Sequence, residues 1–531
     1  MIMVIRLNKR NYWILPVLIV SIVALVITLT NEWPLSWDVY THINYAMTYM
    51  NYGITTVDPY LNAPSGKTIG YAPLFHFLLI FVAFITNSSL LSAAKVFQVI
   101  LPIFCVFLLS YISYKMYNEV AGLATGLLLI SSFMFSRMFY PIPESVAILF
   151  FVTGIYLYYL SIVNKNIWYG LLSGLMALLI LSVHFSSFIY YMILLSVMMV
   201  VEIFNEKNLD GLKSYILAII VIGLVAILGI AAIVMISPSH ISQIFSGFNS
   251  ILSDPMSLFM GQKAMGLERY IKCIGYLPLI FGIIGLIYSF KNRELLFVSA
   301  WTLIAFVFSN LHWFGIPVYT FRMLLYVIMP GVIIGGYGVA KLVEYLDTKQ
   351  KAIPIILIIL LIILSIGSCY SAINDDSFKN TYSSTEISTY HIAPPTSDEV
   401  EVINWFESNG DKNESILTNN QFFGMIISST DEMPMHYNFD QFTNQSSGKS
   451  SLSGLEKEKI GYIVYDKSLV LNNSSEYSEL SVQKVNGSYY PTYYFTKEIT
   501  NDTFEEIQLS STTKVFENNR FIICRVDSNE E

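Results

Sequence analysis

Long apolar runs divide the first 370 residues of this chain, and each is close to the roughly 20 residues that a helix needs to cross a bilayer. Only 13% of the residues are charged and 54% are hydrophobic, whereas about a quarter of the residues in soluble domains are charged. The sequence therefore predicts a polytopic α-helical membrane protein with about 11 transmembrane helices. We place these runs near 12–29, 92–114, 117–135, 145–162, 167–182, 185–203, 214–236, 273–290, 295–311, 322–340 and 353–370.

Lysine and arginine predict how the chain is oriented in the cell membrane. Basic residues precede the first run, which has no small-residue cleavage site, so we expect an uncleaved anchor with a cytoplasmic N-terminus. The apolar piece 71–86 must then enter the outer leaflet and return without crossing, because a crossing there would reverse the charge of the later loops. This arrangement predicts external loops at 31–91, 136–144 and 237–272, and an extracytoplasmic C-terminal region.

The C-terminal region differs in composition from the rest of the chain. From Ser371 onward there are 25 acidic and 11 basic residues, against 13 acidic and 19 basic residues before it. We predict a membrane domain over 1–370, a linker over 371–396 and a soluble domain over 397–531. The segment 397–409 has helical spacing, and short β-rich runs follow it (SILT, KIGYIVYD, YYPTYYF, TKVFEN and RFIICRV), which indicates a small α/β or α+β domain. Nothing in the charge pattern favours nucleic acid as a partner.

Ionisable residues near the outer ends of the runs are the candidates for function, because charges at membrane depth are costly and usually mark a site or pair with each other. Asp38 and His42 lie one turn apart in DVYTHINYAMTYMNYG, a helix that we expect to end at Gly53 as its C-cap. A carboxylate at the start of a helix is favoured by the helix dipole, so Asp38 also has a purely structural explanation as a cap. His42 is equally explained as a packed histidine.

Four more such residues follow along the chain. Asp58 precedes Pro59 in the first external loop, Arg137 and Glu144 flank the second, and Arg322 begins the run 322–340. Glu144 can serve as a helix cap and Arg322 as a snorkelling anchor, so no single residue decides the function.

Taken in order, these segments resemble the STT3-type oligosaccharyltransferases of the GT-C glycosyltransferase superfamily. The resemblance covers most of the first 370 residues in order and layout, through motifs that are each short. DVYTH, DPY, PSG and YAPLF at 38–75 resemble the first external loop of that family, with its Asp-initiated aromatic helix and a later helix that does not cross. SRMFYPIPE at 136–144 resembles the second external loop. TFRMLLYVIMPG at 320–331 resembles the late span whose arginine contacts the phosphate of the lipid-linked donor.

The resemblance implies a glycosyltransferase that moves a sugar or oligosaccharide, with inversion, from a polyprenyl phosphate or pyrophosphate to a protein, lipid or glycan acceptor. Such transfer needs a carboxylate for the acceptor's proton and positive charge on the departing phosphate. Asp38 and Glu144 are the expected catalytic residues, and they are also candidate ligands of Mg²⁺ or Mn²⁺. The expected substrate-binding residues are His42, Asp58, Arg137 and Arg322. Membrane lipids would surround the site.

Two departures from the family pattern keep other functions open. Glu144 is followed by Ser145 and Val146 where the family has a second acidic residue, and TNNQFFGM at 418–425 stands where a WWDYG-type motif is expected. Sequon-specific transfer to Asn is therefore disfavoured, and the protein O-mannosyltransferase or lipid-modifying branches are alternatives. A transporter or flippase of a lipid-linked saccharide is a second hypothesis, although we find no inverted repeat. A non-catalytic membrane protein that displays its exterior domain is a third.

Overall fold

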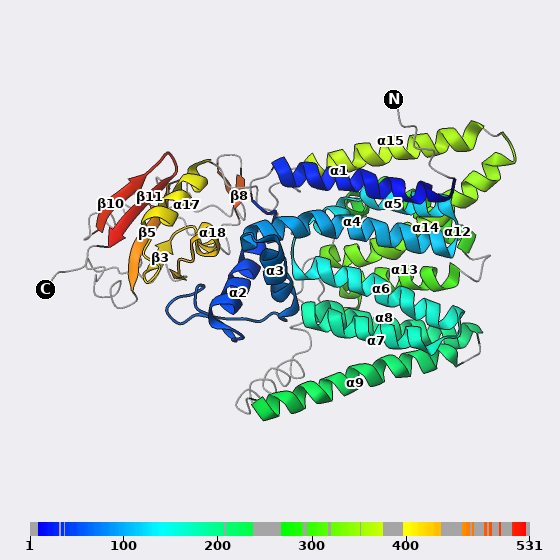
Figure 1. Ribbon diagram of the computed structural model, residues 1–531. Coiled ribbons are helices and arrows are strands. Elements are labelled where there is room, and N and C mark those ends of the chain that lie inside the picture. Colours follow the sequence, from blue (N-terminus) through cyan, green and yellow to red (C-terminus); the bar gives the residue numbers. More distant parts are fainter. Residues whose placement is uncertain are drawn as a thin grey trace.

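The structure is a computed structural model, in which a bundle of long helices carries a C-terminal α/β domain at one end (Figure 1). It describes residues 9–30, 33–36, 38–206, 209–236, 267–289, 295–316, 320–350, 352–374, 397–436, 459–467, 470–471, 483–485, 488–490, 499–500 and 512–526. Most of the predicted loop 237–272 and of the predicted linker 371–396 lies outside these residues.

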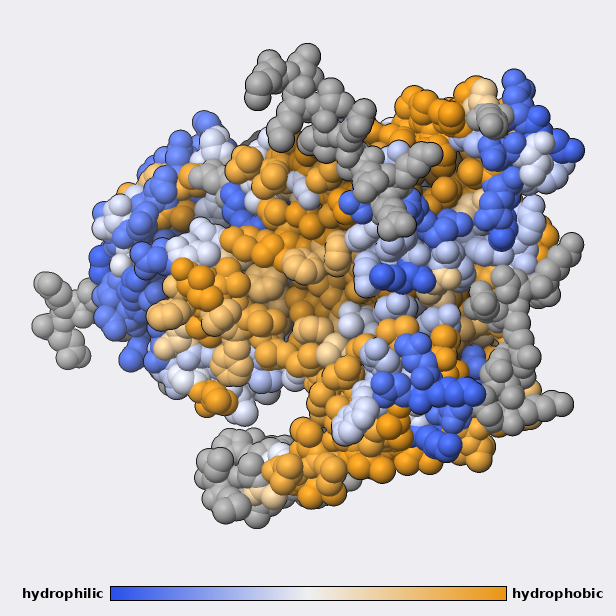
Figure 2. Space-filling view, turned by 45° about the vertical axis from the view of Figure 1, so that its right-hand side comes forward, coloured by the Kyte–Doolittle hydropathy of each residue, from blue (hydrophilic) through white to orange (hydrophobic). Residues whose placement is uncertain are grey.

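Each of the eleven predicted apolar runs contains a helix. Seven helices of the described chain are long and apolar enough to span a membrane, or up to eight if a bent pair is one span, while three predicted spans are shorter apolar helices (α7, α12 and α13). Figure 2 shows hydrophobic residues over the bundle and hydrophilic ones on the C-terminal domain. The bundle comprises η1 (Lys9–Ile14), α1 (Leu15–Thr30), α4 (Leu90–Met116), α5 (Glu119–Ile130), η2 (Phe133–Phe139), α6 (Pro143–Val163), α7 (Ile167–Val183), α8 (Phe185–Glu206), α9 (Asp210–Ile236), α11 (Leu267–Ile274), α12 (Tyr276–Ser289), α13 (Leu296–Ser309), η5 (Leu311–Phe314), α14 (Thr320–Asp347) and α15 (Ala352–Asn374).

Helix α14 lies at the centre of the bundle, with α5, α12 and α13 packed around it. Small residues allow this close approach, as is usual between membrane helices. A Cβ atom on Gly336 would collide with Thr125 of α5, and one on Gly285 of α12 would collide with the backbone of Ile334. These contacts fix the position of α14, and with it the position of Arg322 in its first turn.

The predicted span 117–135 is not one straight helix. Helix α5 ends at Ile130, and the chain then bends by 83° into η2. The hydroxyl of Ser131 donates to the Leu128 carbonyl at 2.7 Å and that of Ser132 to the Cys273 carbonyl at 3.2 Å, which ties the bend to a neighbouring segment. The bend carries Arg137 onto a buried 3-10 turn at the end of the bundle.

The segment 31–91, predicted to be the first external loop, contains α2 (Asp38–Tyr52), β1 (Val57–Asp58), β2 (Lys67–Thr68) and α3 (Leu74–Thr86). Helix α2 ends as the sequence predicts, because Gly53 has a φ of +75° and its amide donates to the Tyr49 carbonyl at 3.1 Å. Helix α3 has 13 residues, about 20 Å at 1.5 Å per residue, which is shorter than the bilayer core. It packs against α2 and α4, and its entry into the outer leaflet stays a prediction.

The C-terminal domain has a five-stranded mixed sheet in the order β10-β11-β5-β3-β4. Strands β3 (Ser415–Thr418), β5 (Ile460–Asp466), β10 (Thr512–Glu517) and β11 (Phe521–Val526) match predicted runs, and α17 (Ser397–Asn409) matches the predicted helix. The elements that were not predicted include α18 (Gln421–Asp431) and β4 (Met435–His436). The remaining short strands are β6 (Val470–Leu471), β7 (Gln483–Val485), β8 (Ser488–Tyr490) and β9 (Ile499–Thr500).

Candidate functional site

Four of the predicted site residues come together at the end of the bundle that faces the C-terminal domain. Asp38 lies at the start of α2, and its carboxylate interacts electrostatically with Arg322, Arg137 and Glu144. These three partners come from α14, η2 and α6. Segments that are separate in the sequence thus place two acids and two arginines within one electrostatic cluster.

Asp38 has the environment of a carboxylate with enhanced proton affinity. It is partly buried in the first turn of α2. Burial raises the pKa of Asp38 above its usual value, while Arg322, Arg137 and Lys67 oppose the rise by stabilising the charged form. A carboxylate of this kind, held beside cations and made more basic by its surroundings, is suited to accept a proton from a bound group.

Glu144 forms a tight ion pair with Arg137, whose Nη2 lies 2.6 Å from Glu144 Oε2. Both side chains are almost fully buried, and the hydroxyl of Ser145 donates to the Arg137 carbonyl at 3.2 Å. The charges of Arg137 and Glu144 nearly cancel. Asp38 and Arg322 carry the next two charges of the cluster. Glu144 also interacts electrostatically with Arg322 and with His184.

His42 lies one turn after Asp38 on α2 and pairs with a second histidine. Its Nδ1 is 3.1 Å from Nε2 of His76 on α3, so one ring donates to the other. Burial lowers the pKa of His42 well below its usual value, and the positive charges that His76, His184 and Lys67 can carry act in the same direction. His42 is therefore a neutral imidazole near physiological pH, with its ring edge against Tyr71 at a centroid distance of 4.7 Å.

Asp58 is fully buried, and its hydrogen bonds organise the loop. Its Oδ1 accepts from the Thr48 hydroxyl at 2.9 Å and from the Tyr60 amide at 2.8 Å, which ties the loop back to α2. The charges that act most strongly on Asp38 are those of Arg322, Arg137, Glu144 and Lys67. Lys67 of β2 connects Asp38 and Asp58, because it interacts electrostatically with both carboxylates.

Sequence reasoning did not identify His184, which lies between α7 and α8 and interacts electrostatically with Glu144, Arg322 and Arg137. Its Nδ1 accepts from the Ser187 amide at 3.3 Å, so the ring proton is on Nε2. The Ser187 hydroxyl lies 2.6 Å from the same Nδ1 and also bonds to Tyr326. A usable signal was present, since a histidine in the short turn between runs 167–182 and 185–203 falls on the predicted external side.

Lys67 and Tyr71 were also not identified as site residues, although Tyr71 begins the YAPLF motif. The Tyr71 ring is 43% exposed beside His42, and its hydroxyl interacts electrostatically with Asp38, Arg322 and Glu144. An exposed aromatic ring at the edge of a charged cluster offers a flat apolar surface to a bound ring.

Asp38 and Glu144 are the two residues of the cluster that are predicted to hold a divalent cation. No group of three or more His, Cys, Asp or Glu side chains with metal-binding geometry occurs among the residues that the structure describes. One oxygen of Glu144 is also committed to Arg137. Arg137 and Arg322 supply positive charge beside these two carboxylates. Binding of Mg²⁺ or Mn²⁺ by Asp38 and Glu144 stays an untested prediction.

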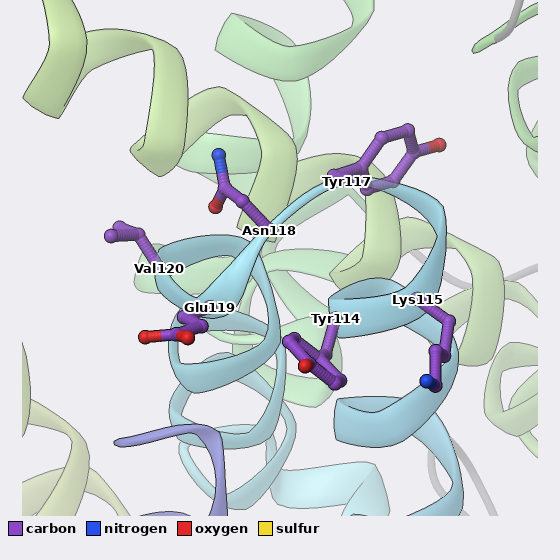
Figure 3. A pocket seen from close by; sticks show the side chains of 6 residues that line it. All are labelled: Tyr114, Lys115, Tyr117, Asn118, Glu119 and Val120. Atoms are coloured by element: carbon purple, nitrogen blue, oxygen red, sulfur yellow. The ribbon is translucent and has the colours of Figure 1, made fainter. Parts of the chain in front are cut away.

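A surface depression lies elsewhere, at the turn between α4 and α5 (Figure 3). Its side chains point in different directions around the turn, and Asn118 is occupied in capping α5 by accepting from the Ala121 amide at 2.9 Å. The depression contains none of the cluster residues, so we place the candidate site at the Asp38 cluster. The residues that line it are Tyr114, Lys115, Tyr117, Asn118, Glu119 and Val120.

Comparison with known proteins bears on the fold. No family model and no curated protein matches the sequence. The apo oligosaccharyltransferase of Archaeoglobus fulgidus aligns with 87% of this chain over 70% of its own length, with a TM-score of 0.60 and 11% identity. ArnT from Cupriavidus metallidurans, bound to undecaprenyl phosphate, aligns with 97% of this chain over 98% of its own, with a TM-score of 0.60 and 9% identity.

A third solved structure is the arabinofuranosyltransferase AftD from Mycobacteria. It aligns with 97% of this chain over 41% of its own length, with a TM-score of 0.57 and 10% identity. At these identities the likeness concerns the fold alone. The chain is a multi-pass membrane protein with a GT-C-like fold, structurally similar to the membrane glycosyltransferases AglB, ArnT and AftD.

Proposed function

We propose that this protein is a membrane glycosyltransferase that moves a sugar or oligosaccharide from a polyprenyl-linked phosphate or pyrophosphate to an acceptor at the outer membrane face. The observation that carries the proposal is the convergence of Asp38 with Arg322 and the Arg137–Glu144 pair at one end of a GT-C-like bundle. Two structures with the same fold support the donor class. ArnT was solved with undecaprenyl phosphate, and AglB with dolichol-phosphate and an inhibitory peptide.

In the proposed step an acceptor N–H or O–H group attacks the anomeric carbon of the donor sugar from the face opposite the phosphate. A new bond forms at that carbon as its bond to the phosphate oxygen breaks, and the configuration inverts. The acceptor's proton passes to the carboxylate of Asp38. The bonding electrons leave with the phosphate, whose growing negative charge is stabilised by Arg322.

The other cluster residues have supporting roles in this proposal. Glu144 shares the catalytic centre by fixing Arg137, and Arg137 contributes positive charge beside the phosphate. His42 is a neutral hydrogen-bonding partner for the substrate. Asp58 acts on binding through the loop that carries Lys67, and Lys67 adds a further positive charge near Asp38.

His184 and Tyr71, which the sequence did not identify, complete the proposed site. His184 offers its Nε2 proton to phosphate or sugar oxygens, since Ser187 holds the other ring nitrogen. Tyr71 offers the exposed ring against which a sugar can pack.

Transport of a lipid-linked saccharide is less well supported. Many secondary transporters bind their substrates near the bilayer midplane, between internal repeats. The charged cluster lies instead at the ends of helices, beside the first external loop and the C-terminal domain. This position suits a reaction at the membrane surface.

The proposal is tested with purified full-length protein in lipid nanodiscs. Polyprenyl-phosphate and polyprenyl-pyrophosphate sugars are supplied with a peptide, a lipid or a glycan acceptor, and release of free polyprenyl phosphate or pyrophosphate is measured by mass spectrometry. We expect release that depends on the acceptor and is accompanied by a glycosylated product. Movement of intact donor between leaflets without its cleavage would contradict the proposal and support transport.

A further inference from the structure

We propose that the C-terminal domain acts as a clamp on α2, and that Asn44 is the positioning residue through which this domain sets the place of Asp38. This inference rests on the proposed function and extends it, because it assigns the C-terminal domain a part in the transfer step besides any part in acceptor binding. Helix α2 is buried on nearly all sides.

Helix α2 carries two polar stripes on different faces. At 100° per residue, the centres of the two stripes are roughly 100° apart around the helix axis. The stripe that contains Asp38 faces α3, since Tyr45 and Tyr49 pack against His76 of that helix. The first stripe comprises Asp38, His42, Tyr45 and Tyr49, and the second comprises Thr41, Asn44 and Thr48.

Two residues of the second stripe, Thr41 and Asn44, are bound by α18 of the C-terminal domain. Asn44 is fully buried, its Nδ2 donates to the Met425 carbonyl at 3.4 Å, and its Oδ1 accepts from the Ser428 hydroxyl at 3.2 Å. Thr41 contacts the sulfur of Met425 at 3.6 Å. An amide that both donates and accepts across an interface fixes the rotation and axial position of a helix, which apolar contact alone does not do.

A second connection runs through the loop that follows α2. The Met435 amide donates to the Tyr60 carbonyl at 2.8 Å, and the Ala63 amide donates to the Met435 carbonyl at 2.8 Å. Leu61 forms a parallel bridge to Met435, so this loop continues the sheet of the C-terminal domain beyond β4. Asp58, in the same loop, accepts a hydrogen bond from Thr48 and so links the loop to α2.

These two connections give the C-terminal domain control over α2, whereas the partners of Asp38 belong to the bundle. Arg322, Arg137 and Glu144 are placed by α14, η2 and α6. The distance between Asp38 and these groups therefore depends on how the domain docks. Displacement of a catalytic group by about 1 Å can lower a rate by around 100-fold. Loss of the contacts between the C-terminal domain and α2 should therefore lower kcat.

The test compares two neighbouring serines of α18 in the full-length protein. Ser428→Ala removes the bond to Asn44, whereas Ser429→Ala is the matched control, because the Ser429 hydroxyl donates only within its own helix, to Ile426 at 2.9 Å. Ser428→Thr keeps a hydroxyl at the position. Asn44→Leu removes both bonds at similar volume and is the stronger variant.

We expect Ser428→Ala to lower kcat about 5- to 20-fold and Asn44→Leu more, with the KM for the donor within twofold of wild type, and Ser428→Thr to restore turnover. Amide hydrogen exchange should become faster in residues 38–52 while β3, β5 and β11 stay protected. The exchange measurement does not depend on activity, so it separates failure of the clamp from failure of the proposed function. Unchanged kcat together with unchanged exchange in Ser428→Ala, or equal losses in the Ser429→Ala control, would overturn the proposal.

Discussion

Arg322, in the first turn of α14, is the charged residue that acts most strongly on Asp38, in the first turn of α2, among the residues that the structure describes. The two residues are separated by most of the membrane domain in the sequence, and each starts a helix at the same end of the bundle. Asp38, which can accept a proton, and Arg322, which can bind a phosphate, are thus close enough to interact electrostatically.

Asp38→Asn should abolish most turnover. The amide keeps the shape of the side chain but cannot accept the acceptor's proton, and loss of such a group typically costs 100- to 10,000-fold in rate. We expect a fall of at least about 100-fold in acceptor-dependent polyprenyl phosphate release, with unchanged yield and melting temperature. Asp210→Asn is the control, because Asp210 pairs with Lys213 at the start of α9, away from the cluster. Wild-type turnover in Asp38→Asn would remove Asp38 from the catalytic centre.

The pH at which activity rises on the acid side of the pH–activity profile should be above the usual pKa of an aspartate. Burial raises the pKa of Asp38, and only its charged form accepts a proton, so activity should increase as the pH rises through that raised pKa. Lys67 opposes the rise, so Lys67→Met should move the acid limb to higher pH, by up to about one unit. The measurement is kcat/KM against pH for both proteins. A shift to lower pH in Lys67→Met would contradict this electrostatic assignment.

Removal of divalent cations should have little effect. Glu144 is paired with Arg137, and no cluster of three metal-binding side chains occurs among the described residues, so the proposed chemistry relies on arginine. We expect protein dialysed against EDTA to retain turnover within about twofold, whereas removal of a catalytic cation would cost several kcal/mol of stabilisation. A loss that Mg²⁺ or Mn²⁺ restores would instead assign a metal to Asp38 and Glu144.

Stability of the C-terminal domain should fall as the pH rises from about 4 to about 7. Burial raises the pKa of Asp431 to about 7, so over this window the unfolded chain releases a proton that the folded domain keeps. The resulting loss is roughly 1.4 kcal/mol per pH unit, and it ends once both states are ionised. Asp431→Asn should therefore raise the melting temperature at pH 8 and flatten its change with pH. A lower melting temperature for the variant at pH 8 would show that the charged form is favourable.

Arg520, in the bend just before β11, should be the most sensitive of the charged residues in the C-terminal domain. Its Nη2 lies 2.6 Å from Asp466 and its Nη1 lies 2.9 Å from Glu399, with all three side chains almost fully buried. Arg520→Met leaves two buried carboxylates without their cation, which typically costs 3–5 kcal/mol. We expect a marked fall in the melting temperature of the domain, whereas Lys514→Met, at an exposed pair with Glu517, should leave it unchanged. Equal effects of the two substitutions would argue against the buried network.

The sequence alone determined where the apolar helices of this fold lie along the chain. A run of about 20 apolar residues can satisfy its backbone in a bilayer only as a helix, so length and hydrophobicity were enough to place the helices. Local chemistry also fixed details, such as the end of α2 at Gly53 and the strands β3, β5 and β11. The order of the motifs selected Asp38, Glu144 and Arg322, because each stands at the end of a predicted run.

Only the tertiary structure decided which of these residues meet. The 83° bend after Ile130, the position of His184 beside Glu144 and the hydrogen bonds from Asn44 to α18 join segments that are far apart in the sequence. No local pattern encodes such contacts, because they arise from the packing of small residues between helices and from the docking of one domain on another. The length of an apolar run is a property of one segment. Electrostatic and hydrogen-bonded neighbours depend on how the whole chain folds.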